Sequence, residues 1–370
     1  MLNREQCLAR VRVLELSDDV GAAFCGQMLG TLGADVVRLI ESDRPRATQV
    51  ESLGVAPDLS AAEVSLDRFK KRLALDGDLE AKRARLADCL ETADVVMTDY
   101  SVEDLRRLGL HWEEVRAAHP RIVFARVSVY GSTGPKAEWR GGDLEAQALA
   151  GVAGQLGAAD GTPVCMPYKA GLMHGGLHTA AAIAAALFHR CLSGEGTFID
   201  IATVQALASD VRNYSLMMRY YDLPLKRSGR RPQGSLGRYP TAIFPCKDGY
   251  VVMTARSGEQ YHNMLAMMGN PAWAQEPRYQ NHYAMAMEYP DEVDALVIPW
   301  LMNYTRAELV QKGLEHRFPI GPLLTLDEVL DDEQYRFRGF FGTLEAAGRS
   351  YVLPGNPALF TRADAPIAAQ

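Results

Sequence analysis

One carboxylate in an otherwise bare stretch, RGGDLEAQALAG at residues 140–151, is the side chain of this chain best suited to chemistry. Asp143 follows two glycines and begins a predicted helix, where an aspartate commonly binds the first free amides as a cap. A carboxylate can also attack an acyl group and form an acyl-enzyme intermediate. Small neighbours leave room for a bulky acyl compound, and nearby amides can stabilise an oxyanion. The stretch is therefore either a helix cap or a nucleophile.

Two other segments are candidates for binding an anion. Gly21 and the small residues after it follow a predicted strand and begin a helix, whose unpaired amides can hold phosphate. The alternative is close packing of helix on sheet, because the sequence has neither GxGxxG nor a Walker lysine. The second segment, DRFKKRLALD, is either an anion site or a solvated turn; its basic residues are Arg68, Lys70, Lys71 and Arg72.

Composition excludes several classes of protein. The chain has 370 residues, of which 48% are hydrophobic, enough for two or more domains, and its net charge of -7 argues against a general nucleic-acid or membrane-surface role. The six cysteines form no CxxC pair and the eight histidines no HExxH or HxH group, so we expect no metal site. Without a signal-peptide pattern, and with its longest apolar run at 179–188 too short to span a bilayer, the chain is expected to be cytoplasmic.

Strand and helix patterns alternate in the first third of the chain. This alternation predicts βαβ units and a mostly parallel sheet, in which ligands bind at the carboxyl ends of the strands. The strands are expected at 11–16, 35–40, 93–99 and 121–129.

The pattern changes after residue 222. An Ala-rich helix at 178–190 and a strand at 196–203 come first, and 241–255 is typical of a hairpin with Asp248-Gly249 as its turn. We expect a large Rossmann-like α/β domain at 1–222, a Gly- and Pro-rich linker at 223–240, a smaller α+β domain at 241–317, and a segment at 318–370 that returns to the large domain.

Taken in order, these segments resemble the class III CoA-transferase (CaiB/BaiF) family, which includes formyl-CoA and carnitine CoA-transferases. The resemblance covers nearly the whole chain, and it is the order and spacing of the motifs that are specific. The matching stretches are VRVLELS with GAAFCGQMLGTLGADVVRLIE, DRFKKRLALD, ADVVMTDYSVEDLRRLGLHWEEVRAAHPRIVFARVSVYGSTGP, RGGDLEAQALAG, GEGTFIDIATVQAL, KDGYVV and LPGNP.

The resemblance implies a reaction that suits a lone carboxylate. Asp143 would attack an acyl-CoA to give a mixed anhydride, and the CoA thiolate would convert this to an aspartyl-CoA thioester. A carboxylic acid acceptor would then collect the CoA, without a metal. The family also implies an interlocked homodimer.

The family's cofactor contacts carry over position by position as expectations. Arg38, Lys70 and Arg107 would meet the nucleotide and phosphates of CoA. The residues that would line the rest of the cofactor are Asp19, Val20, Gly21, Asp99, Tyr100 and Ser128. The segment 255–263 is expected to shape the acyl pocket, with Glu259, Tyr261 and His262 as candidates.

Several positions depart from the family pattern and leave open a specialised or weakened enzyme. Ala22-Ala23 replaces Gly-Pro, Val129 replaces a Gly, and Asp67 and Asp99 each replace an Asn. Ser101-Val102-Glu103 replaces Arg-Pro-Gly.

Three alternatives remain beside CoA transfer. The α-methylacyl-CoA racemase branch of the family needs two acid/base groups, but Gly142 and Pro167 stand at their positions here. A CoA-binding protein without catalysis would also retain much of the pattern. A nicotinamide dehydrogenase is disfavoured by the missing GxGxxG fingerprint.

Overall fold

The structure, a computed structural model, describes residues 6–42, 61–222, 227–231, 237–346 and 348–360. The chain divides into two compact units: unit 1 comprises 1–152, 165–210 and 333–370, and unit 2 comprises 153–164 and 211–332. Parts of the expected linker, 223–226 and 232–236, lie outside the described residues. The domain boundaries that we expect from the sequence stay predictions.

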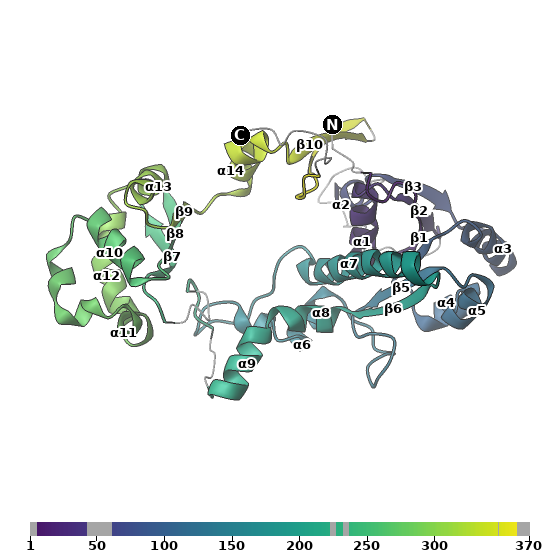
Figure 1. Cartoon of the computed structure of the whole chain (residues 1–370), viewed down its shortest axis with the longest axis horizontal. Helices are drawn as coiled ribbons and strands as arrows, with labels where there is room; N and C mark the ends of the chain where they lie inside the picture. Colours follow the sequence, from purple (N-terminus) through teal and green to yellow (C-terminus); the bar gives the residue numbers. More distant parts are fainter. Residues whose placement is uncertain (1–5, 43–60, 223–226, 232–236, 347, 361–370) are drawn as a thin grey trace. The chain divides into compact units, whose positions relative to one another are not determined.

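Unit 1 is built on a six-stranded sheet in the order β3-β2-β1-β4-β5-β6 (Figure 1). Every neighbouring pair of its strands is parallel, which confirms the predicted parallel sheet. The order is that of a doubly wound fold, in which ligands bind at the carboxyl ends of the strands. The strands are β1 Arg12–Leu16, β2 Asp35–Ile40, β3 Lys70–Ala74, β4 Val95–Thr98, β5 Val123–Ser128 and β6 Thr197–Ala202.

Helices cover both faces of this sheet, so its central strands are apolar on both sides. Leu14 and Leu16 of β1 pack in one cluster with side chains of α3 Leu79–Leu90, α4 Val102–Leu108 and α5 Trp112–Ala118. Val13, which points the other way, packs in a second cluster with α1 Val20–Thr31 and α7 Ala170–Ser193. This alternation within one strand fixes which helices lie on which face.

Helix α7 begins eight residues before the predicted Ala-rich helix at 178–190. The sequence did not indicate this earlier start because the added segment is rich in glycine, which has a low helix propensity. The glycines allow close packing on α1: a Cβ on Gly176 would lie 2.2 Å from the Gly21 carbonyl oxygen. Among the described residues α7 is also the one helix long and apolar enough to cross a membrane, by length and composition only. The prediction that the apolar run at 179–188 is too short to span a bilayer therefore does not hold for the whole helix. Packing against α1 and the sheet accounts for much of its apolar composition.

The remaining elements of unit 1 are short. Its second sheet is an antiparallel hairpin of β10 Phe341–Ala346 and β11 Arg349–Pro354. The other α-helices are α2 Ala61–Leu66, α6 Asp143–Leu149, α8 Thr203–Asp210 and α15 Glu333–Phe337.

Unit 2 has its own core around an antiparallel sheet of β7 Thr241–Cys246, β8 Gly249–Thr254 and β9 Ile320–Pro322. The predicted hairpin is confirmed, but Cys246 pairs with Gly249, so the turn is Lys247-Asp248, one residue earlier than expected. The α-helices of this unit are α9 Arg212–Tyr221, α10 Gly258–Met267, α11 His282–Met287, α12 Pro290–Leu301, α13 Arg306–Glu315 and α14 Leu326–Asp331.

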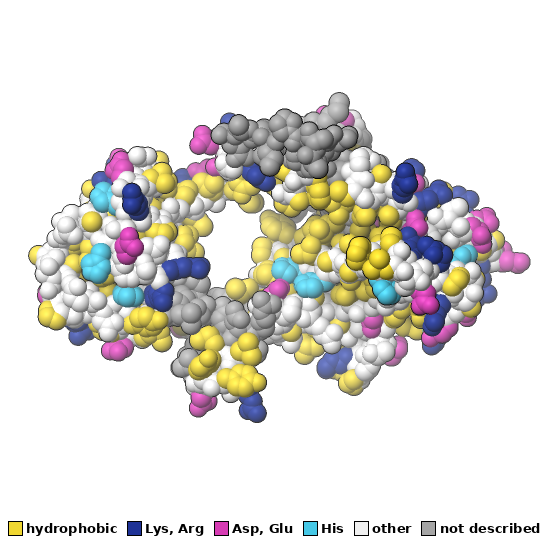
Figure 2. All heavy atoms as spheres, in the orientation of Figure 1, with side chains coloured by type: hydrophobic (Ala, Val, Ile, Leu, Met, Phe, Trp, Pro, Cys, Tyr) yellow, Lys and Arg dark blue, Asp and Glu magenta, His cyan; other side chains and the backbone are white. Residues whose placement is uncertain are grey.

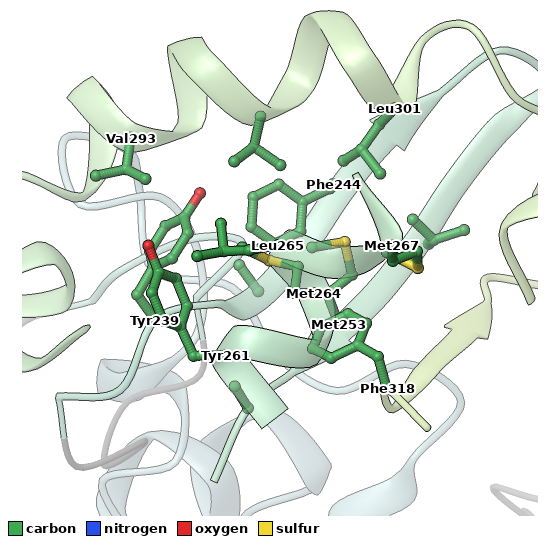
Figure 3. Close-up of a cluster of buried hydrophobic side chains, with 14 of the residues drawn as sticks. Tyr239, Phe244, Met253, Tyr261, Met264, Leu265, Met267, Val293, Leu301 and Phe318 are labelled. Atoms are coloured by element: carbon green, nitrogen blue, oxygen red, sulfur yellow. The ribbon is translucent and has the colours of Figure 1, made fainter. Parts of the chain in front are cut away.

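Figure 3 shows the unit 2 core, in which Phe244, Met264 and Leu301 pack together. Tyr261, a sequence candidate for the acyl pocket, lies in this core with 1% of its surface exposed. Its hydroxyl donates to the Tyr279 carbonyl oxygen at 2.8 Å. Tyr261 therefore serves packing, and this part of the pocket prediction was wrong.

Candidate active site

Asp143 is the first residue of α6, but its carboxylate does not cap that helix. Gly142 is the N-cap, and its amide donates to Glu145 Oε2 at 2.9 Å. Asp143 instead accepts a hydrogen bond from the Leu172 amide at Oδ1 (2.8 Å) and one from the Gln147 side-chain amide at Oδ2 (2.5 Å). The interpretation of Asp143 as a simple cap of its own helix was therefore wrong.

The Leu172 amide belongs to the first turn of α7, whose unpaired N–H groups and dipole favour a negative charge. The half-buried carboxylate of Asp143 thus joins two helices of unit 1 at their amino ends. Gly171 makes the approach feasible, since a Cβ there would lie 2.9 Å from Asp143 Oδ1.

A pocket of about 420 Å³ lies beside this site, at the carboxyl ends of β1, β4 and β5. Two wall residues connect it to Asp143: Gly141, two positions earlier in the chain, and Leu172, the hydrogen-bond donor. Four of the nine predicted cofactor residues share this wall, namely Asp19, Gly21, Asp99 and Ser128.

Asp99 holds the loop between β1 and α1 in place. Its carboxylate accepts hydrogen bonds from the amides of Asp18 (3.0 and 3.2 Å) and Asp19 (2.8 Å). Burial raises the pKa of Asp99 to about 7, the nearby Asp18 carboxylate adds to this, and the two backbone hydrogen bonds oppose it. A proton at the pocket wall therefore titrates near neutral pH.

The same loop is tied to the start of α7. Asp19 caps α1 by accepting from the Val20 amide at 2.7 Å, and the same oxygen lies 3.1 Å from Lys169 Nζ. Val20 itself is buried. Asp19 therefore orders the pocket wall in addition to lining it.

Arg126 is a pocket residue that sequence reasoning missed. It is largely buried on β5, donates to the Tyr100 carbonyl oxygen at 2.8 Å and to Ser132 Oγ at 2.7 Å, and burial lowers its pKa. Tyr100 is buried and does not line the pocket, whereas Ser128 Oγ accepts from the Gly131 amide at 3.0 Å. Arg126 and Arg140 are basic residues of the wall.

Arg38 and Lys70, expected at the nucleotide, do not line this pocket. Both side chains are fully buried in an ion-pair network with Glu15 and Asp67. Arg38 lies 2.6 Å from Asp67, and Lys70 lies 2.8 Å from Glu15 and donates to the Ala23 carbonyl oxygen. Their charges are neutralised inside the protein, so the expectation that they contact CoA directly is not met by this geometry.

Arg107 is 45% exposed on α4, with Asp104 at 3.7 Å and Glu41 at 4.0 Å. It lies outside the wall of the pocket. Its exposed guanidinium can still meet a ligand that extends along the surface of α4, and its contact with CoA stays a prediction.

Within the described ranges, no group of three His, Cys, Asp or Glu side chains could hold a metal ion. His174 and His178, four positions apart on α7, have other contacts: His174 lies 2.9 Å from Asp210, and His178 Nδ1 lies 2.9 Å from the His174 carbonyl oxygen.

Gln147 is the second residue that the sequence reasoning missed. It lies four positions after Asp143 on α6, so the two side chains share one helix face. That spacing was the available signal for finding it.

Comparison with known proteins identifies the family of the chain. The chain matches the model of CoA-transferase family III over residues 8–370. It is 28% identical over 366 residues to the succinate–glutarate CoA-transferase of Agrobacterium fabrum, covering 96% of this chain and 89% of the relative. It is 24% identical over 377 residues to the formyl-CoA:oxalate CoA-transferase of Afipia carboxidovorans, covering 95% of this chain and 87% of the relative.

A solved structure shares the fold. The CaiB/BaiF family protein from Brucella suis superposes with a TM-score of 0.83 at 24% sequence identity, over 96% of this chain and 92% of that one. Together with the family match over nearly the whole sequence, this shows that the chain belongs to CoA-transferase family III.

Proposed function

We propose that this protein transfers CoA from an acyl-CoA donor to a carboxylic acid, with Asp143 as the nucleophile. One observation carries the assignment: the half-buried Asp143 carboxylate is oriented by amides at both oxygens and adjoins a pocket at the carboxyl ends of the parallel strands. The related proteins named above are CoA-transferases, which supports the same reaction class.

The first half-reaction would load CoA onto the enzyme. An Asp143 oxygen attacks the thioester carbonyl of the donor, the C–S bond breaks, and CoA leaves as the thiolate. The thiolate then attacks the Asp143 carbonyl carbon of the mixed anhydride. The donor acid leaves as a carboxylate with one oxygen from Asp143, and an aspartyl-CoA thioester remains.

The second half-reaction reverses these steps with a new acid. The acceptor carboxylate attacks the aspartyl thioester and expels the CoA thiolate, which then attacks the acceptor carbonyl of the new anhydride. The products are acceptor acyl-CoA and Asp143, which now carries an oxygen from the acceptor. No net proton transfer is needed.

We assign Asp19, Gly21, Asp99 and Ser128 to the binding of the CoA thioester because they share the pocket wall. Arg126 and Arg140 would supply positive charge there. The names of related enzymes include succinate, glutarate, citramalate and oxalate, so a substrate panel begins with dicarboxylic acids and their CoA thioesters.

A racemase reaction is less consistent with this site. Both hydrogen-bond donors to Asp143 are amides, which neither release nor take up protons near neutral pH. Racemisation requires two acid/base groups at the substrate carbon.

The interlocked homodimer and the cytoplasmic location are parts of the same proposal. An apolar stripe along the exposed side of α7 supports a dimer, because such a surface is usually covered. Figure 2 shows apolar side chains gathered over this helix. The stripe consists of Leu177, Ala181, Ala184, Ala185, Phe188 and Leu192. Light scattering coupled to gel filtration should give twice the mass of the 40.6 kDa chain.

Intact-protein mass spectrometry after mixing with acyl-CoAs tests the proposed function. We expect an adduct of acyl or CoA mass on the wild type that hydroxylamine removes and that Asp143→Ala abolishes. Absence of an adduct with every thioester tried, together with exchange of the substrate α-proton in deuterated water, would favour the racemase alternative.

A further inference from the structure

The side chain of Gln147 joins Asp143 to the loop before α7. Its Nε2 donates to Asp143 Oδ2 at 2.5 Å and to the Met166 carbonyl oxygen at 3.1 Å, and its Oε1 accepts from the Met166 amide at 2.7 Å. Gln147 has none of its surface exposed. One buried amide group thus makes three hydrogen bonds, all to this corner of the site.

The loop that Gln147 holds is conformationally demanding. Tyr168 and Lys169 both have φ of 56°, a region that side chains other than glycine rarely adopt. Such backbone conformations are strained and persist only where the surrounding contacts hold them. The paired hydrogen bonds between Gln147 and Met166 provide that hold, two residues before the first unusual φ.

The same loop sets the start of α7, and so places the Leu172 amide against Asp143 Oδ1. Gln147 therefore acts on both oxygens of Asp143. It binds Oδ2 directly, and through Met166 it fixes the segment that brings the second donor to Oδ1.

We propose that Gln147 is the positioning residue of Asp143, an assignment that rests on the proposed function for its chemical consequence. Its amide orients the carboxylate for attack on the thioester. In the mixed anhydride the acyl group is bonded to one Asp143 oxygen; when this is Oδ1, Oδ2 becomes the carbonyl oxygen and keeps Gln147 Nε2 as its hydrogen-bond donor. That donor stabilises the oxyanion that forms when the CoA thiolate attacks Asp143.

A purely structural explanation is weaker. A Gln–Asp pair at i, i+4 stabilises an isolated helix only slightly, and it needs neither burial nor the two bonds to Met166. Glu145 supplies the matched control on α6, because it binds the Gly142 amide and stabilises the helix start without contacting Asp143 in any described hydrogen bond.

The first test reads the geometry of Asp143 without any CoA compound. Purified full-length protein is treated with a water-soluble carbodiimide and an amine, and the peptide that contains Asp143 is quantified by mass spectrometry. We expect Gln147→Leu to change the labelling rate of Asp143 at least threefold, because a donor no longer occupies Oδ2, and Glu145→Gln to leave it unchanged. Equal rates in Gln147→Leu and wild type would overturn the proposal.

The second test reads the chemistry. Removal of one donor of this kind lowers kcat by about 100-fold or more, and we expect Gln147→Leu to do so while the KM for acyl-CoA changes less than about threefold. Gln147→Glu should regain at least tenfold of that loss as the pH falls from 7.5 to 5.5, because only a protonated Glu can donate to Asp143. A Gln147→Glu profile parallel to that of wild type contradicts the positioning role.

The two tests separate this proposal from the proposed function. Altered labelling of Asp143 in Gln147→Leu, with no acyl adduct on the wild type, would support the positioning role of Gln147 and contradict CoA transfer. Formation of the adduct at the wild-type rate in Gln147→Leu would support CoA transfer and contradict the positioning role of Gln147.

Discussion

Two clusters of polar side chains in unit 1 differ in how their charges are satisfied. Around Glu15, Arg38 and Lys70, every charge faces an opposite charge and all three side chains have zero exposure. At Asp143 the carboxylate is half-buried, and its described hydrogen bonds come from uncharged amides of Gln147 and Leu172. In the first cluster the buried charges pair with one another and stabilise the fold. In the second cluster the carboxylate is oriented by neutral donors and stays available for reaction.

The largest effect is expected at the available charge. Asp143→Asn should lower CoA transfer by about 1,000-fold or more, because an amide is a far poorer nucleophile than a carboxylate. The fold should change little, since an Asn oxygen can still accept from the Leu172 amide and only the hydrogen bond from Gln147 Nε2 is lost. Initial rates and thermal melting together test this; more than a tenth of wild-type activity would show that another group is the nucleophile.

The next effect concerns the closed network. Lys70→Met should destabilise the protein by about 3–5 kcal/mol, because it removes one partner of a buried ion pair. Urea unfolding measures the change. Arg107→Ala, on the exposed surface of α4, should cost less than about 1 kcal/mol.

The Lys70→Met variant can also contradict this distinction between the two clusters. Normal stability of Lys70→Met with a loss of CoA affinity would mean that Lys70 contacts the cofactor, as the family resemblance implies, and that the network opens on binding.

Gly171 tests how closely α7 must approach the nucleophile. A Cβ there would lie 2.9 Å from both Asp143 Oδ1 and Gln147 Cγ. Gly171→Ala should therefore destabilise the protein by about 1–3 kcal/mol through overpacking. Displacement of Asp143 in this variant should lower kcat by on the order of tenfold. Gly258→Ala, with no atom within 4 Å of the added methyl, is the control. Equal activity of the two variants would show that the carboxylate tolerates movement.

The smallest expected effect is the contribution of Asp99 to the pH dependence of the free energy of unfolding. Its pKa is about 7 in the folded protein, against about 3.9 in an unfolded chain, so the folded state holds the extra proton between these values. Stability from this group is present below about pH 4 and is lost as the pH rises toward 7.

Asp99→Asn should remove this slope. We expect the variant to equal or exceed the wild type in stability at pH 8, with a difference on the order of 1 kcal/mol relative to pH 5. Urea unfolding at the two pH values measures it. An unchanged slope would show that Asp99 is ionised throughout this range.

The sequence predicted the parallel sheet because strand and helix patterns alternate along the first third of the chain. Asp143 could also be singled out, since the Gly-Gly before it and the order of motifs around it pointed to the same residue. Both predictions depend on residues close together in the chain, where pattern and structure are directly linked.

The sequence did not predict the partners of the charged residues, because these partners depend on strand register and on loop conformation. Arg38 is neutralised because the pairing of β1 with β2 places it opposite Glu15, and nothing in either strand alone specifies that register. The contact of Asp143 with Leu172 depends on the backbone of Tyr168 and Lys169, which adopt a φ that their residue types do not favour. Charged residues can thus be found in a sequence before their partners can.

The most direct test of the central claim follows an oxygen atom. The acceptor acid is labelled with ¹⁸O in its carboxylate, the reaction is run for several turnovers, and the peptide that contains Asp143 is analysed by mass spectrometry. If Asp143 forms the anhydride, its carboxylate gains ¹⁸O from the acceptor and later passes it to the released donor acid. Transfer of CoA with no ¹⁸O in that peptide or in the donor acid would contradict a covalent role for Asp143.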